Sequence, residues 1–197
     1  MSLVIFDGHH LVAQGEVSAA LELAYQYLKK TPDAKLHVLN AVSARAIQLD
    51  FDQSMDKLKQ EVALQNGDPP EPARRGRGRP KLGVVSREVS LLPRHWEWLE
   101  AQSGGVSGAL RRLIEQARKT PENQIQEARQ AVEKAMQSMA TDLPNYDEAL
   151  VQFNRYQYLP MFELMVTWPD DVQRFCRELV NRVRELEMEL KPRRRQD

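Results

Sequence analysis

The sequence has little cysteine and no long apolar run. Its single cysteine, Cys176, excludes a disulfide within the chain and suits a reducing compartment. No apolar run approaches the roughly 18 to 20 residues that a membrane-spanning helix needs. The N-terminus, MSLVIFDGHH, also lacks the basic region and long apolar core of a signal peptide. These absences predict a cytoplasmic protein with no membrane partner.

Signatures of catalysis and of metal binding are also missing. No glycine-rich loop follows a strand-like run, no Cys/His spacing fits zinc, and no nucleophile elbow is present. His9 and His10 are adjacent, so on a strand they point to opposite faces and cannot easily share one ion. We therefore expect no enzyme activity, no cofactor and no metal site.

Net charge is absent overall, because 28 Lys/Arg balance 28 Asp/Glu. This balance hides three blocks of different sign. Residues 1–72 carry 6 basic and 10 acidic residues, residues 73–120 carry 11 and 4, and residues 121–197 carry 11 and 14. A basic block between two acidic flanks predicts a polyanionic partner for the middle of the chain only.

The first 64 residues predict a small α+β domain of ββαββα order. Asp7-Gly8 is a strong hairpin signal between two short apolar runs, and Thr31-Pro32 ends an amphipathic helix that begins near Glu16. The expected strands are residues 3–6, 10–13, 36–39 and 46–49, and the second helix is expected over residues 53–64. Residues 65–81, rich in proline and arginine, form the expected linker.

Residues 120–197 predict a helical region. Pro121 suits the first position of a helix that runs to about residue 140, Asn145 suits a helix cap, and Pro160 interrupts the next segment. The last helix carries a heptad-like seam, which indicates either a dimer contact or packing within the chain's own bundle. The seam comprises Val172, Cys176, Leu179, Val183, Leu186 and Leu190.

The arginine run holds a specific motif. Arg77-Gly78-Arg79-Pro80 resembles the core of an AT-hook, a peptide that lies extended in the minor groove. The narrow groove of A·T tracts attracts guanidinium groups, a glycine permits close approach, and a proline keeps the peptide extended. Gly76 departs from the proline of the fullest hooks. A solvated basic linker or an RNA-binding arginine-glycine segment is the alternative.

Residues 82–119 resemble a ribbon-helix-helix module, in which two chains pair one strand each and the ribbon enters the major groove. Residues 84–91 are the expected strand, Leu92-Pro93 the step into a helix, and residues 102–105 the turn. Ser107 is the expected cap of the second helix. The resemblance implies a homodimer and a phosphate contact at the start of that helix.

The register of the expected strand has two solutions. One places Ser86, Glu88 and Ser90 toward the groove; a shift by one residue places Arg87, Val89 and Leu91 there instead. The first register keeps the apolar residues inward, and the second improves the charge that faces DNA. A strand and two helices that merely form part of a domain core remain a third interpretation.

Four stretches together resemble a bacterial family of unknown function. They are FDG at residues 6–8, RGRPKLGVVSREVSLLPRHWEWL at residues 77–99, EA at residues 148–149 and WP at residues 168–169. The resemblance implies a bacterial cytosolic protein. It carries no catalytic residues, so the functional expectation rests on the residues themselves.

The sequence thus predicts a DNA-binding protein that prefers A·T-rich sites, either a transcriptional regulator or a nucleoid-associated factor. The alternative is an antitoxin-like adaptor whose basic linker is merely solvated. The expected DNA contacts are Arg74, Arg75, Arg77, Gly78, Arg79, Pro80, Lys81, Ser86, Arg87, Glu88, Ser90, Gly105, Val106 and Ser107.

Overall fold

The computed structural model describes residues 1–66 and 87–190. Its N-terminal part is a four-stranded antiparallel sheet in the order β2-β1-β3-β4. The strands are β1 (Ser2–Asp7), β2 (His10–Glu16), β3 (Leu36–Asn40) and β4 (Ala46–Ile47). Gly8 has a φ of +56°, which the tight turn between β1 and β2 requires. The predicted hairpin and the ββαββα order are confirmed, although β2 is longer and β4 shorter than expected.

Eight α-helices and one 3-10 turn lie in the described ranges. They are α1 (Val17–Lys30), α2 (Met55–Asn66), α3 (Pro93–Glu100), α4 (Gly105–Arg118), α5 (Pro121–Met139), α6 (Tyr146–Asn154), α7 (Tyr158–Leu164), η1 (Met165–Thr167) and α8 (Asp170–Leu190). The mixed α+β class, with a helical C-terminal region, is therefore confirmed. Within these ranges, no helix has the length and apolar character to cross a bilayer.

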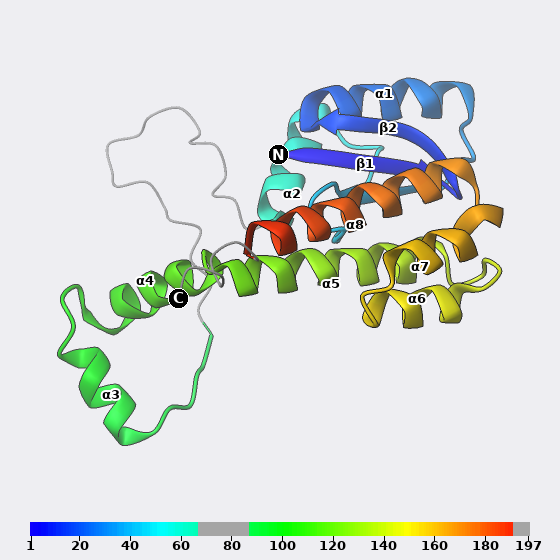
Figure 1. The fold of residues 1–197 in the computed structure, drawn as a ribbon. Coiled ribbons are helices and arrows are strands. Elements are labelled where there is room, and N and C mark those ends of the chain that lie inside the picture. Colours follow the sequence, from blue (N-terminus) through cyan, green and yellow to red (C-terminus); the bar gives the residue numbers. More distant parts are fainter. Residues whose placement is uncertain (67–86, 191–197) are drawn as a thin grey trace.

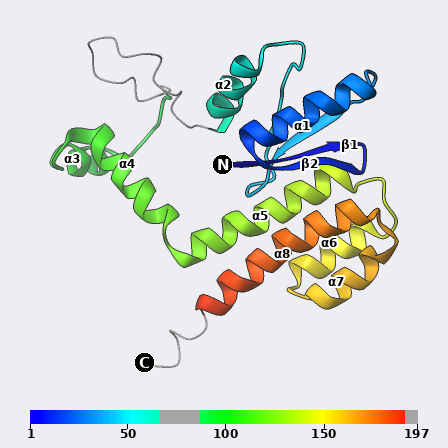
Figure 2. The same cartoon turned by 90° about the horizontal axis from the view of Figure 1, so that it is seen from above.

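Helices cover both faces of the sheet (Figures 1 and 2). Alternate residues of β1 point to opposite faces, so Leu3 and Ile5 join one core with α1 and α2. Val4 and Phe6 join the other core, which α5 to α8 build. The rings of Phe6 and Phe175 on α8 lie 5.9 Å apart, centroid to centroid. We call this three-layer unit, residues 1–66 and 121–190, the sandwich.

The sandwich changes the domain division expected from the sequence. Residues 1–64 and 120–197 were expected as separate units, yet the structure joins residues 2–66 and 121–190 through one sheet. The physical reason lies in β1, whose residues 3–6 are all fully buried. A strand that is apolar on both faces needs cover on both, and α1 and α2 can cover only one.

The seam of α8 packs inside the sandwich. Val172, Cys176 and Val183 are fully buried there, against α5 and the sheet. Burial raises the pKa of the Cys176 thiol to about 12. Of the two interpretations of the heptad spacing, the structure bears out packing within the chain's own bundle.

Three local expectations are corrected. Pro160 lies in the first turn of α7, where its missing N–H removes no helical hydrogen bond. Asn145 precedes α6 as expected, but its side chain makes no capping bond and its φ is +60°. Residues 87–91 of the expected strand 84–91 form no strand, because the described part of this single chain offers them no partner strand.

Candidate nucleic-acid interface

Helices α3 and α4 form a helical hairpin that extends away from the sandwich (Figure 1). We call residues 87–119 the lobe. Only Leu99 and Ala109 of the lobe are buried. Several of its large apolar side chains are about half exposed, among them Trp98 at 52% and Ile114 at 55%. Val89, Leu92 and Leu113 are exposed as well. The lobe therefore has almost no core of its own.

The turn between the two helices depends on glycine. Gly104 and Gly105 have φ values of +85° and +68°, in the left-handed region that other residues rarely adopt. A Cβ on Gly104 would also lie 3.2 Å from Nη1 of Arg112. Arg112 turns back toward the turn, where its Nη2 donates to the Ser103 carbonyl oxygen at 2.7 Å. The turn thus brings a guanidinium group to the start of α4.

The start of α4 differs in detail from the expectation. The helix begins at Gly105 with Gly104 as its N-cap, so Ser107 lies in the first turn and does not cap it. The reason is the left-handed Gly104, which starts the helix earlier than a serine cap would. Gly105, Val106 and Ser107 nevertheless lie together at the helix start; the Gly105 N–H donates to the Gln102 carbonyl, and the N–H groups of Val106 and Ser107 have no acceptor within the helix. With Arg112 nearby, this end of the helix can accept an anionic oxygen.

The remaining expected contacts lie before α3 or outside the described residues. Arg87, Glu88 and Ser90 lie in the irregular segment that leads into Pro93, and all three are exposed. Val89 between them is equally exposed, so neither proposed register has a buried inner face in the single chain. The contacts at Arg74, Arg75, Arg77, Gly78, Arg79, Pro80, Lys81 and Ser86 lie outside the described residues.

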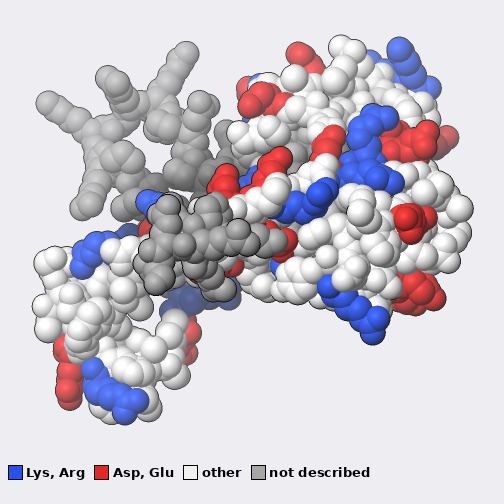
Figure 3. All heavy atoms as spheres, viewed as in Figure 1, with Lys and Arg blue, Asp and Glu red and all other residues white. Residues whose placement is uncertain are grey.

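The electrostatics of the lobe are mixed. On the face of the lobe that Figure 3 shows, separate basic and acidic patches lie among uncharged side chains. Arg118 lies 3.4 Å from Glu127 and 3.9 Å from Glu115, so part of the positive charge is neutralised. The arrangement can hold individual phosphates, but the described lobe does not form a continuous basic track.

Arg112 is the residue that the sequence-based site omitted. If the strand and two helices merely form part of a domain core, the sequence predicts that Arg111 and Arg112 are a solvated face of the second helix. The Gly104-Gly105 pair was the sequence signal for this contact. Glycines leave the turn without side chains, so a long side chain two turns into the helix can reach back over it. The reach of Arg112 depends on its conformation, which the sequence alone does not give.

An α+β sandwich with a helical lobe is the class that this geometry defines. The chain belongs to the family described as "Uncharacterized protein conserved in bacteria (DUF2239)", which matches residues 2–180. The match covers the sheet, the lobe and the C-terminal helices as far as the middle of α8, and it confirms the resemblance to a bacterial family. No curated protein and no solved structure matches the chain.

Proposed function

We propose that this protein binds DNA as a homodimer through residues 73–119 and acts as a transcriptional regulator or nucleoid-associated factor. The supporting observation is that the described lobe leaves most of its large apolar side chains exposed. Two buried residues cannot stabilise two helices, and an exposed apolar face of this kind marks an interaction surface. A second copy of the lobe supplies the missing cover, as in ribbon-helix-helix proteins.

The segment before α3 supports the same proposal. Residues 87–91 make no backbone hydrogen bond to other described residues, so a second copy could pair them in an antiparallel ribbon. That pairing would give Val89 an apolar neighbour and select one of the two registers. The ribbon places the protein on the major groove, and the start of α4 with Arg112 holds a phosphate.

The basic run supplies the proposed A·T preference. Residues 74–81 contain five Lys/Arg within an Arg-Gly-Arg-Pro context. Because the lobe is only mildly basic, we expect the run to contribute most of the affinity and the ribbon to contribute placement. Five or six phosphate contacts give a slope of log K against log salt of roughly −4.5 to −5.5.

A mobility-shift assay across a salt series tests the proposal. We expect binding to A·T-rich duplexes in preference to G·C-rich duplexes of equal length, with the salt slope given above. Arg77→Ala with Arg79→Ala should remove the preference, whereas the control Lys29→Ala with Lys30→Ala on α1 should not. Absence of binding to either duplex at low salt contradicts the proposal.

The exposed apolar face also favours the second candidate, an adaptor that recruits a protein partner. Trp98 and Ile114 would then contact that partner, and the arginine run would only be solvated. Light scattering distinguishes the candidates, because the adaptor is monomeric and indifferent to DNA.

A further inference from the structure

A groove of about 780 Å³ lies between the first turns of α5, the last turns of α8 and the segment that joins α6 to α7. Its walls are largely apolar and include Ile125, Met188, Leu190 and the ring of Tyr156. Met188 and Tyr156 remain 57% and 61% exposed, so the described chain leaves these walls uncovered. A groove of this size suits a small organic molecule.

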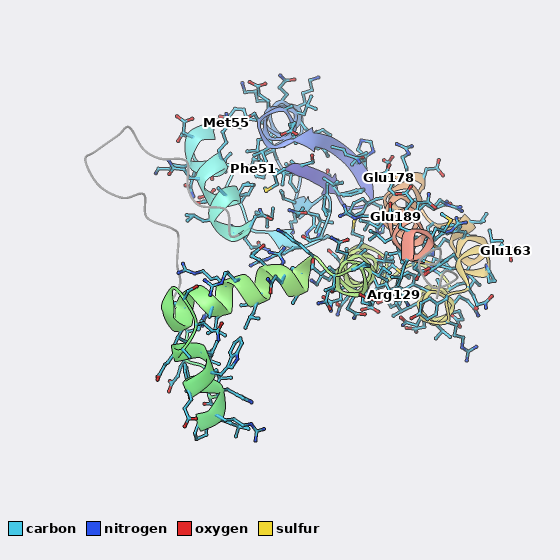
Figure 4. All side chains as sticks on the ribbon, turned by 60° about the vertical axis from the view of Figure 1, so that its left-hand side comes forward. Phe51, Met55, Arg129, Glu163, Glu178 and Glu189 are labelled. Carbon is cyan, nitrogen blue, oxygen red and sulfur yellow. The ribbon has the colours of Figure 1, made fainter. Side chains whose placement is uncertain are left out.

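Arg129 on α5 lines the groove beside the end of α8 (Figure 4). It is the one buried charged residue within residues 1–66 and 87–190, with 8% of its surface exposed. Its guanidinium carbon lies 4.4 Å from the ring centroid of Phe153 and 4.2 Å from that of Tyr156. The aromatic rings fix the guanidinium plane, which prepares its edge for a planar acceptor.

Among the described residues, the positive charge of Arg129 has only a long ion pair, with Glu187. Its Nη2 donates to the Phe153 carbonyl and its Nη1 to the Tyr158 hydroxyl, each at 3.2 Å. Glu187 Oε1 lies 3.8 Å from Nη1, beyond the roughly 2.7 to 2.9 Å of a charge-assisted hydrogen bond. That oxygen instead accepts from the Tyr158 hydroxyl at 2.8 Å. Burial, then this hydrogen bond, raises the pKa of Tyr158, which keeps the hydroxyl protonated as a donor.

We infer that this groove binds a small monocarboxylate with an apolar or aromatic body. The ligand carboxylate approaches Arg129 more closely than Glu187 does, with Arg184 at the rim, and the apolar body lies along Met188 and Leu190. Glu122 and Glu187 also line the groove, and their charges disfavour a dianion such as a phosphate monoester. An organic cation is disfavoured, because it would lie beside the positive charge of the Arg129 guanidinium.

The test uses three ligands with one body and different charge: phenylbutyrate, phenylbutanol and phenylbutylammonium. Isothermal titration calorimetry on the full chain should show phenylbutyrate binding at least about tenfold more tightly than the alcohol, with the ammonium weakest. Equal binding of the three, no binding of phenylbutyrate, or tightest binding of the ammonium overturns the inference.

Variants locate the site without disturbing the core. Met188→Glu places an acid on an exposed wall and should weaken phenylbutyrate binding at least about tenfold, whereas Leu64→Glu, equally exposed on α2, should not. Glu187→Gln should strengthen binding, because it removes the competing carboxylate. Unchanged affinity in Met188→Glu overturns the assignment to this groove.

Discussion

The sandwich and the lobe differ in how far they bury their apolar side chains. The sandwich takes elements from both ends of the chain and buries both faces of its sheet, with residues 3–6 of β1 fully enclosed. The lobe, inserted between those ends, buries only Leu99 and Ala109 and exposes Trp98 and Ile114. The described residues bury the apolar side chains of the sandwich but leave those of the lobe largely exposed, and the proposed dimer would supply their cover.

The largest expected effect is the difference in the free energy of unfolding between replacing a buried aromatic side chain and replacing a half-exposed one. Phe6→Ala should lower the free energy of unfolding by about 3–5 kcal/mol, because it removes a ring that joins the sheet to α8. Trp98→Ala should cost about 1 kcal/mol or less in dilute protein, because half of the side chain already meets water. Urea denaturation measures both. Equal costs would contradict the contrast between the two regions.

A smaller effect tests whether a second copy of the chain covers the exposed apolar side chains of the lobe. Leu113→Lys with Ile114→Lys should raise the dimer dissociation constant by about 100-fold, because two lysines cannot be buried against a second copy. The urea midpoint of the diluted protein should change little. Val166→Lys, at a similarly exposed position on the sandwich, is the control. Light scattering over a concentration series reads the result, and an unchanged dissociation constant would argue against a lobe-mediated dimer.

The smallest expected effect is a pH dependence of stability that arises from one histidine of the sandwich. Burial lowers the pKa of His37, whose Nε2 also contacts the Ser138 hydroxyl. The unfolded chain therefore takes up a proton before the folded chain does, and this contribution to stability, present above about pH 6.5, is lost as the pH falls below it. His37→Asn should flatten the fall in the urea midpoint between about pH 7 and about pH 5.

Ser138→Ala distinguishes the cause of that effect. It removes the hydroxyl but leaves His37 half-buried, so the pH dependence should persist. If Ser138→Ala flattens the profile as much as His37→Asn does, hydrogen bonding and not burial governs the titration.

Much of the fold could be predicted from the sequence because its signals are local. Asp7-Gly8 specifies the hairpin, Thr31-Pro32 ends α1, and Pro121 begins α5. The joining of the two ends was missed, because which surfaces meet is not a local property. The uninterrupted apolar run of residues 3–6 did carry a signal, since burial of both faces of a strand calls for helices on both sides.

In the candidate sites, too, local features could be predicted from the sequence, whereas contacts that depend on packing could not. The Gly104-Gly105 turn and the helix that follows were predictable from the residues, whereas the reach of Arg112 depends on its conformation. Arg129 stands four residues after Ile125 and three before Val132, within the apolar stripe of α5. A charge in that position indicates a buried and partnered group, but its partners on α7 and α8 emerge only from the packing.

Hydrogen exchange read by mass spectrometry tests the central claim, that the chain is one sandwich built from both ends with an incomplete lobe between them. In dilute protein, β1, β3, α5 and α8 should exchange slowly and with one common opening free energy, while α3 and α4 exchange quickly. Slow exchange in α3 and α4 of the dilute monomer would contradict the account. So would opening of β1 and β3 independently of α5 and α8.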